Sequence, residues 1–183
     1  HPDFPTDRRV FVNYSTTPAS SENTADIIVS SFELSGDGLS INPQSETVMI
    51  RQRRSFFHQG GFMAFDSDGL LYIGLGDGAD QRDPTGNAQN LTLLLGKILR
   101  IDVDSGSPYA IPPSNPYANR NDGTAREIYA LGLRNPFRGD IDPVSGELYV
   151  GDVGLSGREE VDDVESRQNY GWPIKEGSRC LDE

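Results

Sequence analysis

His58 is the residue in this sequence best suited to move a proton. The chain has 2 histidines, and a neutral imidazole accepts a proton near physiological pH. His58 stands just ahead of a β-like run that begins at Gly61, whereas His1 lies at the start of the chain and is a poorer candidate. On the residue alone, a surface histidine in a loop is the favoured alternative, so a general base has to be argued from the surrounding pattern.

Acidic residues gather at two further places. Segment 66–69 resembles the beginning of a calcium loop, but it lacks the downstream glutamate of an EF-hand and follows a strand, so we interpret it as a hairpin turn. Asp77, Asp80 and Asp83 lie in a glycine-rich loop just beyond another strand. They either line the mouth of a cavity or, as we expect by default, belong to a solvated loop.

Short apolar runs separated by turn residues predict a chain built of β-strands. The 20 glycines and 12 prolines are scattered between these runs, which favours many turns over long helices. One short helix is plausible near residues 90–95. The predicted strands are residues 10–16, 27–34, 47–53, 61–65, 70–75, 97–103, 127–131, 137–142, 147–152 and 161–164.

Two hairpins, at residues 65–74 and 141–151, repeat one pattern, and residues 1–12 form a looser third copy. Glycine in the turns supplies the positive φ of a tight reversal. Repeats of several strands suggest propeller blades, although a β-sandwich with similar turns is the alternative. A propeller closes with about 4 to 8 blades. We therefore predict an all-β fold in which residues 1–183 cover roughly three blades, with the first and last blades incomplete or absent.

Charge and composition exclude several kinds of partner. The chain carries 16 basic and 28 acidic residues, a net charge of −12, and no basic stripe, so we expect neither nucleic acid nor an anionic membrane as a partner. No apolar run reaches the length of a membrane span.

The start at His1 suggests a processed or cut chain. The single Cys180 cannot form a disulfide within it, and two glycosylation-type triplets begin at Asn13 and Asn90.

Six motifs, in this order, resemble those of the soluble quinoprotein sugar dehydrogenases, a family that includes hedgehog-interacting-protein-like domains. The resemblance runs from His1 to about Cys180, and its strength comes from the register of all six. The motifs are Gly60-Gly61-Phe62-Met63-Ala64-Phe65, Leu71-Tyr72-Ile73-Gly74-Leu75-Gly76-Asp77-Gly78, Asn87-Ala88-Gln89-Asn90-Leu91 with Leu94-Leu95-Gly96-Lys97-Ile98-Leu99-Arg100-Ile101-Asp102, Glu127-Ile128-Tyr129-Ala130-Leu131-Gly132-Leu133-Arg134-Asn135-Pro136, Tyr149-Val150-Gly151-Asp152-Val153-Gly154 and Asn169-Tyr170-Gly171-Trp172-Pro173.

This resemblance implies a six-bladed β-propeller that holds pyrroloquinoline quinone (PQQ) and calcium and oxidises a sugar to its lactone. Such an oxidation removes a proton and a hydride, so it needs a base and an electrophilic acceptor. His58 matches the family's catalytic histidine. Arg134 and Asn135 match a pair that contacts the quinone, where a guanidinium stabilises arriving negative charge; a structural arginine is the alternative. Pro136 restricts Asn135 to an extended conformation.

The same resemblance assigns two calcium sites. Consecutive backbone carbonyls of Gly154 and Leu155 match the ligands of the quinone-side ion, and calcium accepts such oxygen ligands in irregular loops. Glu160 and Tyr170 match a structural site, to which the tyrosine would contribute its backbone carbonyl. Glu159 is adjacent, and a register error of one residue would exchange it with Glu160. For Trp172, burial is favoured over stacking on a sugar.

One departure leaves the function open. Phe57 precedes the histidine where the family usually has a polar Asp or Asn, which puts sugar specificity and activity in question. The leading hypothesis is a PQQ- and calcium-dependent sugar dehydrogenase with a sugar substrate and an electron acceptor as partners. A non-enzymatic extracellular propeller that binds a protein or carbohydrate is second, and a propeller lactonase is third. We expect an extracellular or periplasmic location, the remaining blades as partners, and possible homo-oligomers.

Overall fold

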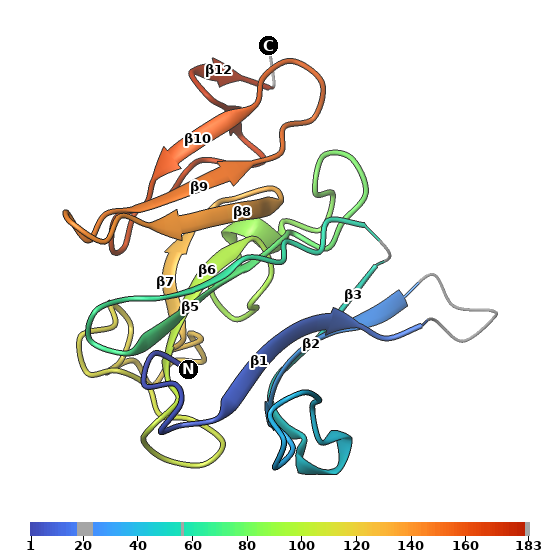
Figure 1. Cartoon of the computed structure of the whole chain (residues 1–183). Coiled ribbons are helices and arrows are strands. Elements are labelled where there is room, and N and C mark those ends of the chain that lie inside the picture. The colour runs from blue at the N-terminus through green and yellow to red at the C-terminus, as the bar shows by residue number, and fades with distance from the viewer. Residues whose placement is uncertain (18–23, 56, 182–183) are drawn as a thin grey trace.

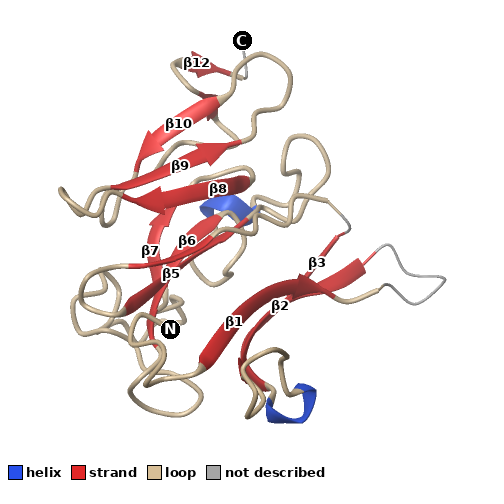
Figure 2. Cartoon of the chain, viewed as in Figure 1, coloured by secondary structure: helices blue, strands red, loops and turns tan. Residues whose placement is uncertain are grey.

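The computed structural model describes residues 1–17, 24–55 and 57–181, and antiparallel strands dominate it (Figures 1 and 2). Strands hold 39% and helices 3% of the described residues, so the predicted all-β class is confirmed. No helix among these residues is long and apolar enough to cross a membrane. The strands are β1 (Arg9–Ser15), β2 (Thr24–Glu33), β3 (Thr47–Ser55), β4 (Met63–Phe65), β5 (Leu70–Leu75), β6 (Lys97–Asp102), β7 (Ile128–Leu131), β8 (Pro136–Ile141), β9 (Leu148–Asp152), β10 (Glu160–Asp163), β11 (Lys175–Glu176) and β12 (Arg179–Cys180).

Consecutive strands pair with one another, so each sheet is a continuous piece of chain. Within the described residues the strand orders are β1-β2-β3, β4-β5-β6-β7, β8-β9-β10 and β11-β12. The three larger sheets succeed one another from the N-terminal to the C-terminal end of the colour scale in Figure 1. This succession of small antiparallel sheets is the arrangement that propeller blades have.

The middle sheet is buried on both faces because successive side chains of a strand point in opposite directions. Along β5, Leu71 and Ile73 pack into a core shared with Ile27 of the first sheet. Tyr72, between them, packs into a second core that contains Val150 of the third sheet. The fully buried strands of the middle sheet therefore join the flanking sheets, and the loops at their ends are held in fixed positions.

The two repeated hairpins form as predicted, with β4 pairing β5 and β8 pairing β9. In the first turn, Asp66 Oδ1 accepts the amide hydrogens of Asp68 and Leu70, at 3.0 and 2.9 Å. Asp142 Oδ1 accepts those of Val144 and Ser145 in the second. Asp66 is thus a turn residue, in line with the hairpin interpretation.

The prediction of a helix near residues 90–95 is wrong. A three-residue 3₁₀ turn, η2 (Asn87–Gln89), lies just before it, and the segment continues in turns. Asn90 Oδ1 accepts both the amide and the hydroxyl hydrogen of Thr92, at 2.9 and 2.8 Å. Such side-chain bonds offer the backbone an alternative to helix. Lys97 Nζ also donates a hydrogen bond to the Leu95 carbonyl at 2.6 Å, which fixes the end of the segment.

The short strands β11 and β12 have no counterpart among the predicted strands. They pair Lys175 with Cys180 and Glu176 with Arg179. Two-residue strands carry too little periodicity to be recognised in a sequence. The Cys180 side chain is a free thiol and is exposed.

Candidate functional site

His58 lies in the connection from β3 to β4 and has a left-handed backbone, with φ of +45°. This conformation is uncommon for residues other than glycine and needs support from neighbours. The Gly78 amide donates to the His58 carbonyl at 3.3 Å. That carbonyl also packs against Gly76, where a Cβ atom would collide with it. The glycines after β5 therefore admit the histidine turn and fix its position.

Asp77 is the partner of His58. The distance between His58 Nδ1 and Asp77 Oδ1 is 2.7 Å, and the Asp77 side chain is 0% exposed. Because a carboxylate only accepts hydrogen bonds, His58 Nδ1 is the donor, and in the neutral imidazole the free lone pair is on Nε2. The described residues give Nε2 no hydrogen-bond partner, and the His58 side chain is 13% exposed. The pair has the geometry of an oriented general base.

The acidic loop is not uniformly solvated, so the default interpretation is wrong for two of its three members. Asp77 and Asp83 are buried, whereas Asp80 is exposed. Asp83 accepts the amide hydrogens of Asn87 and Ala88, at 2.9 and 2.8 Å, and so fixes the beginning of η2. Asp83 is accordingly a structural residue.

Trp172 connects the base to the proposed quinone-contacting arginine. Its Nε1 donates to Asp77 Oδ2 at 2.7 Å, and the guanidinium carbon of Arg134 lies 5.3 Å from the centroid of its ring. Trp172 is buried, as predicted. Arg134 Nη1 donates to the Val153 carbonyl at 2.8 Å. Its Nε is buried and has no acceptor among the described residues.

Asp152 holds the Arg134-Asn135 pair in place. Its two carboxylate oxygens accept the amide hydrogens of Arg134 and Asn135, at 2.8 and 2.6 Å. Burial raises the pKa of Asp152 to about 6. Asn135 Oδ1 accepts the Gly60 amide at 2.8 Å, which ties this loop to the His58 turn. The Asn135 Nδ2 group donates to no acceptor among the described residues and is available for a further contact.

Gly154 and Leu155 follow β9 in a loop whose amide hydrogens point at carboxylates. Gly154 N donates to Glu159 Oε2 at 3.1 Å, and Leu155 N donates to Glu176 Oε1 at 2.5 Å. Neither the Gly154 nor the Leu155 carbonyl accepts a hydrogen bond from the described residues. The two oxygens are thus available as ligands of a hard cation. Glu176, which lies in the unpredicted β11–β12 hairpin, was not anticipated from the sequence.

Glu160 and Tyr170 line one cavity, together with Lys175 and Gly177. The Tyr170 hydroxyl donates to the Asp163 carbonyl at 2.6 Å, so its phenol is engaged elsewhere. The Tyr170 carbonyl accepts nothing from the described residues. Glu160 Oε1 accepts the Gly177 amide at 2.7 Å, and burial raises the pKa of Glu160. Because Glu159 instead bonds Gly154, Glu160 is the glutamate at this cavity.

A family model for glucose/sorbosone dehydrogenases matches residues 1–180 of the chain. The chain belongs to this family. In sequence, the family member aldose sugar dehydrogenase of Escherichia coli (strain K12) is 35% identical over 175 residues, 94% of this chain and 44% of that protein. The hedgehog-interacting protein of Homo sapiens is 41% identical over 88 residues, 46% of this chain and 12% of that protein.

A solved structure supports the same assignment to the glucose/sorbosone dehydrogenases. The PQQ-bound aldose sugar dehydrogenase of Streptomyces coelicolor superposes with a TM-score of 0.75 at 27% identity, covering 97% of this chain and 47% of that one. The predicted fold class, part of a β-propeller, is confirmed. This glucose/sorbosone dehydrogenase chain spans about half the length of the sugar dehydrogenases that it matches.

A cavity of about 640 Å³ adjoins the histidine–aspartate pair of this family member. Phe57 and Gly78, the chain neighbours of His58 and Asp77, line it together with Arg54, Asp80 and Leu95. Phe57 is 49% exposed. The position before His58 therefore presents an aromatic face to this cavity, in place of the expected polar group.

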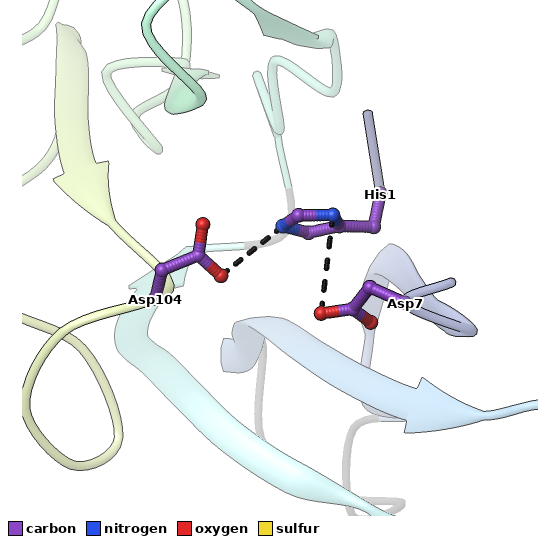
Figure 3. Close-up of side chains that lie close together, drawn as sticks. All are labelled: His1, Asp7 and Asp104. Atoms are coloured by element: carbon purple, nitrogen blue, oxygen red, sulfur yellow. Dashed lines mark hydrogen bonds and ion pairs between the residues drawn. The ribbon is translucent and has the colours of Figure 1, made fainter. Parts of the chain in front are cut away.

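His1 forms a second cluster with carboxylates, shown in Figure 3. Its Nε2 lies 3.1 Å from Asp104 Oδ1, and its Nδ1 lies 3.9 Å from Asp7 Oδ2. Arg9 Nη2 pairs with both carboxylates. Because Arg9 supplies a positive charge there, the cluster is an ion-pair network that attaches the N-terminal segment to the loop after β6.

The two glycosylation-type triplets lie in different surroundings. Asn13 lies in β1, and its Nδ2 is buried. Asn90 is exposed in the loop before β6. Since modification requires an accessible amide nitrogen, Asn90 is the more suitable of the two.

Proposed function

We propose that the complete protein oxidises the anomeric hydroxyl of an aldose to a lactone, using PQQ and calcium. The observation that carries the proposal is the buried His58–Asp77–Trp172 chain, which leaves His58 Nε2 as an acceptor and ends beside Arg134. A base and a fixed cation within one network are the protein groups that this oxidation requires.

The residues of this chain fit both PQQ and calcium. Arg134 Nε is a buried donor without an acceptor among the described residues, as expected next to a carbonyl oxygen of a quinone. The unbonded carbonyls of Gly154 and Leu155 have the chemistry of calcium ligands, as do the Glu160 carboxylate and the Tyr170 carbonyl. Arg134 and Asn135 would hold PQQ, and these two donor sets would hold calcium.

In the proposed mechanism His58 Nε2 takes the proton of the sugar hydroxyl. Asp77 keeps the imidazole in the correct tautomer and stabilises its positive charge once it is protonated. PQQ, when bound, supplies the electrophilic carbonyl that accepts the hydride leaving the anomeric carbon. The Arg134 guanidinium offsets the negative charge that arrives with this hydride.

The domain itself is proposed to be incomplete, with its first and last blades partial or absent in residues 1–183. Exposed apolar side chains on the third sheet support this, since Tyr149 of β9 and Val161 of β10 are 41% and 80% exposed. Another blade packed on this face would cover them. We therefore expect residues 1–183 alone to be inactive, and the remaining blades to be their partners.

An extracellular or periplasmic location is also part of the proposal. The sugar, the acceptor and any homo-oligomeric contact belong to the complete protein. Exposed Asn90 is compatible with secretion but does not require it.

The proposal is tested on the complete protein supplied with PQQ and calcium. With a panel of aldoses and an artificial electron acceptor, we expect dye reduction that disappears in His58→Ala. PQQ binding is followed separately by absorbance titration. Lack of activity on every sugar, with PQQ bound, would count against sugar oxidation and leave cofactor binding intact.

A non-enzymatic extracellular propeller is the second candidate. Phe57 in place of a polar residue favours it, as does the similarity to the hedgehog-interacting protein. This alternative predicts that the complete protein shows no absorbance change with PQQ but retains a protein or carbohydrate ligand on a column. The absorbance titration therefore discriminates between the two functions.

A further inference from the structure

Glu176 is a buried carboxylate in the β11–β12 hairpin. Its side chain is among the largest fully buried ones, and the residue is 1% exposed. Oε1 accepts the Leu155 amide at 2.5 Å and, more weakly, the Ser156 amide at 3.4 Å. Among the described residues no Lys, Arg or His forms an ion pair with it, although Arg179 lies nearby: a Cβ at Gly157 would lie 3.2 Å from Glu176 Oε2 and 3.6 Å from Arg179 Nη1. A buried negative charge is costly unless a positive charge lies nearby.

The hydrogen bonds of Glu176 fix the direction of two carbonyl groups. The cis peptide bonds of the described chain all precede prolines, so the bonds on either side of Leu155 are trans. In a trans peptide the N–H and C=O bonds point in opposite directions. The Gly154 and Leu155 carbonyls, which share peptide units with the two donors, therefore point away from Glu176.

The peptide unit between Val153 and Gly154 shows the same arrangement. Gly154 N donates to Glu159 at 3.1 Å, while the carbonyl of that unit, on Val153, accepts from Arg134 Nη1 at 2.8 Å. One side of the loop thus faces carboxylates, and the carbonyl of its first peptide unit faces the proposed quinone-contacting arginine. Because N–H and C=O point in opposite directions, the carbonyl oxygen of this unit lies on the side of the loop that faces Arg134.

Close packing leaves this loop little freedom. A Cβ at Gly154 would collide with the Arg158 carbonyl and lie 2.8 Å from Glu176 Oε1. Glu176 itself is held by pairing of β11 with β12. The carboxylate is therefore a fixed support around which the loop is wrapped.

We propose that Glu176 is a positioning residue that aims the Gly154 and Leu155 carbonyls at calcium and strengthens them as ligands. A hydrogen bond from an amide to a carboxylate polarises the peptide and increases the negative charge on its oxygen. The calcium ion would in turn offset the buried charge of Glu176. This inference rests on the proposed function, in which the two carbonyls bind the ion.

The test compares Glu176→Gln, Glu176→Met and the control Glu147→Gln in the complete, metal-free protein. Gln keeps an acceptor oxygen without the charge, and Met fills similar space without an acceptor. Glu147 is an exposed carboxylate in the β8–β9 turn. Calcium alone is titrated by calorimetry, in a Glu160→Gln background that removes the side-chain ligand of the other proposed site.

We expect Glu176→Met to weaken calcium binding about 10- to 100-fold, as loss of an outer-shell partner does. Glu176→Gln should weaken it less, and Glu147→Gln should stay within about twofold of the unchanged protein. If the calcium affinity of Glu176→Met lies within twofold of that of the unchanged protein, the proposal is overturned. If this variant does not fold, the same result for Glu176→Gln overturns it.

Hydrogen exchange at the Leu155 and Ser156 amides separates this inference from the proposed function. Without calcium, exchange should be faster in Glu176→Met than in Glu176→Gln or the unchanged protein. Equal rates overturn the positioning role even if calcium binds. An unchanged protein that binds no calcium rejects the calcium part of the proposed function, while the exchange rates still report whether Glu176 orders the loop.

Discussion

The two histidines of this chain both contact aspartate, yet only His58 keeps a ring nitrogen without a partner among the described residues. His1 uses both ring nitrogens: Nδ1 accepts the Asp3 amide at 3.1 Å, and Nε2 contacts Asp104. His58 uses Nδ1 for Asp77, and its Nε2 has no hydrogen-bond partner among the described residues. Both side chains are largely buried, at 3% and 13% exposure. Burial next to a carboxylate is therefore common to both histidines, and the ring nitrogen without a partner is what supports the proposal of His58 as the base.

The charges around the two clusters differ as well. Arg9 pairs with both carboxylates at His1, so a fixed positive charge already offsets part of the negative charge of that cluster. Asp77 instead receives neutral donors, from Trp172 and from the Ala79 amide at 2.9 Å. Its negative charge remains to stabilise a protonated His58.

The largest expected effect comes from exchanging each histidine for asparagine in the complete protein. His58→Asn should lower kcat for aldose oxidation about 100- to 10,000-fold, because the general base is lost. His1→Asn should leave kcat within about twofold, because neither ring nitrogen is free to react. Steady-state kinetics with a dye acceptor measures both. Equal losses in the two variants would contradict the distinction.

Asp77→Asn is expected to have the next largest effect. An amide can donate to His58 Nδ1 and so favour the wrong tautomer, which should lower kcat about 100-fold or more. Asp68→Asn, at an exposed aspartate in the turn before β5, is the matched control and should keep full activity. The hypothesis of an oriented base fails if Asp77→Asn and Asp68→Asn have the same kcat.

Trp172→Phe should have a smaller effect, about tenfold on kcat, since it removes the donor to Asp77 Oδ2 but leaves the His58 bond in place. The Arg134 guanidinium would also lose part of its aromatic surface. Rapid-mixing kinetics and a thermal melt separate the catalytic from the structural part. A lower melting temperature with unchanged kcat would show that Trp172 serves only packing.

Arg9→Met should produce the smallest effect, a loss of about 0.5–1 kcal/mol of stability with no change in kcat. The hydrogen bond from Arg9 holds the pKa of Asp7 below its ordinary 3.8. A depressed acid pKa contributes stability above the unfolded value, and this is lost as pH falls through the folded value.

The stability difference between Arg9→Met and the unchanged protein should therefore be full at neutral pH and shrink below about pH 4. Urea denaturation at several pH values measures it. A difference that stays constant down to pH 2 would show that Asp7 does not gain its stability from Arg9.

The sequence predicted much of the scaffold because the signals are local. Alternating apolar residues and turn glycines located β5 and β9 closely, and the hairpins form as expected. The predicted helix does not form because the Asn90 side chain accepts a hydrogen bond from Thr92 and Lys97 Nζ donates to nearby backbone carbonyls. The propensity of residues 90–95 could not reveal these competing bonds.

Much less of the site could be read in the same way. The motifs singled out His58, Arg134 and Trp172, but they placed Asp77 in a solvated loop. Its burial depends on Trp172, 95 residues further along the chain. Glu176 and its hairpin were missed because their support of the 154–156 loop is equally non-local.

By itself the sequence determined the strand-rich fold, the repeated hairpins and the residue types needed for proton and hydride chemistry, since these follow from local periodicity and composition. Only the tertiary structure decided which histidine keeps a free nitrogen and which acids are buried. It also decided which carboxylates hold the Gly154-Leu155 loop. Those properties depend on contacts between blades, where the distance along the chain carries no information about the distance in space.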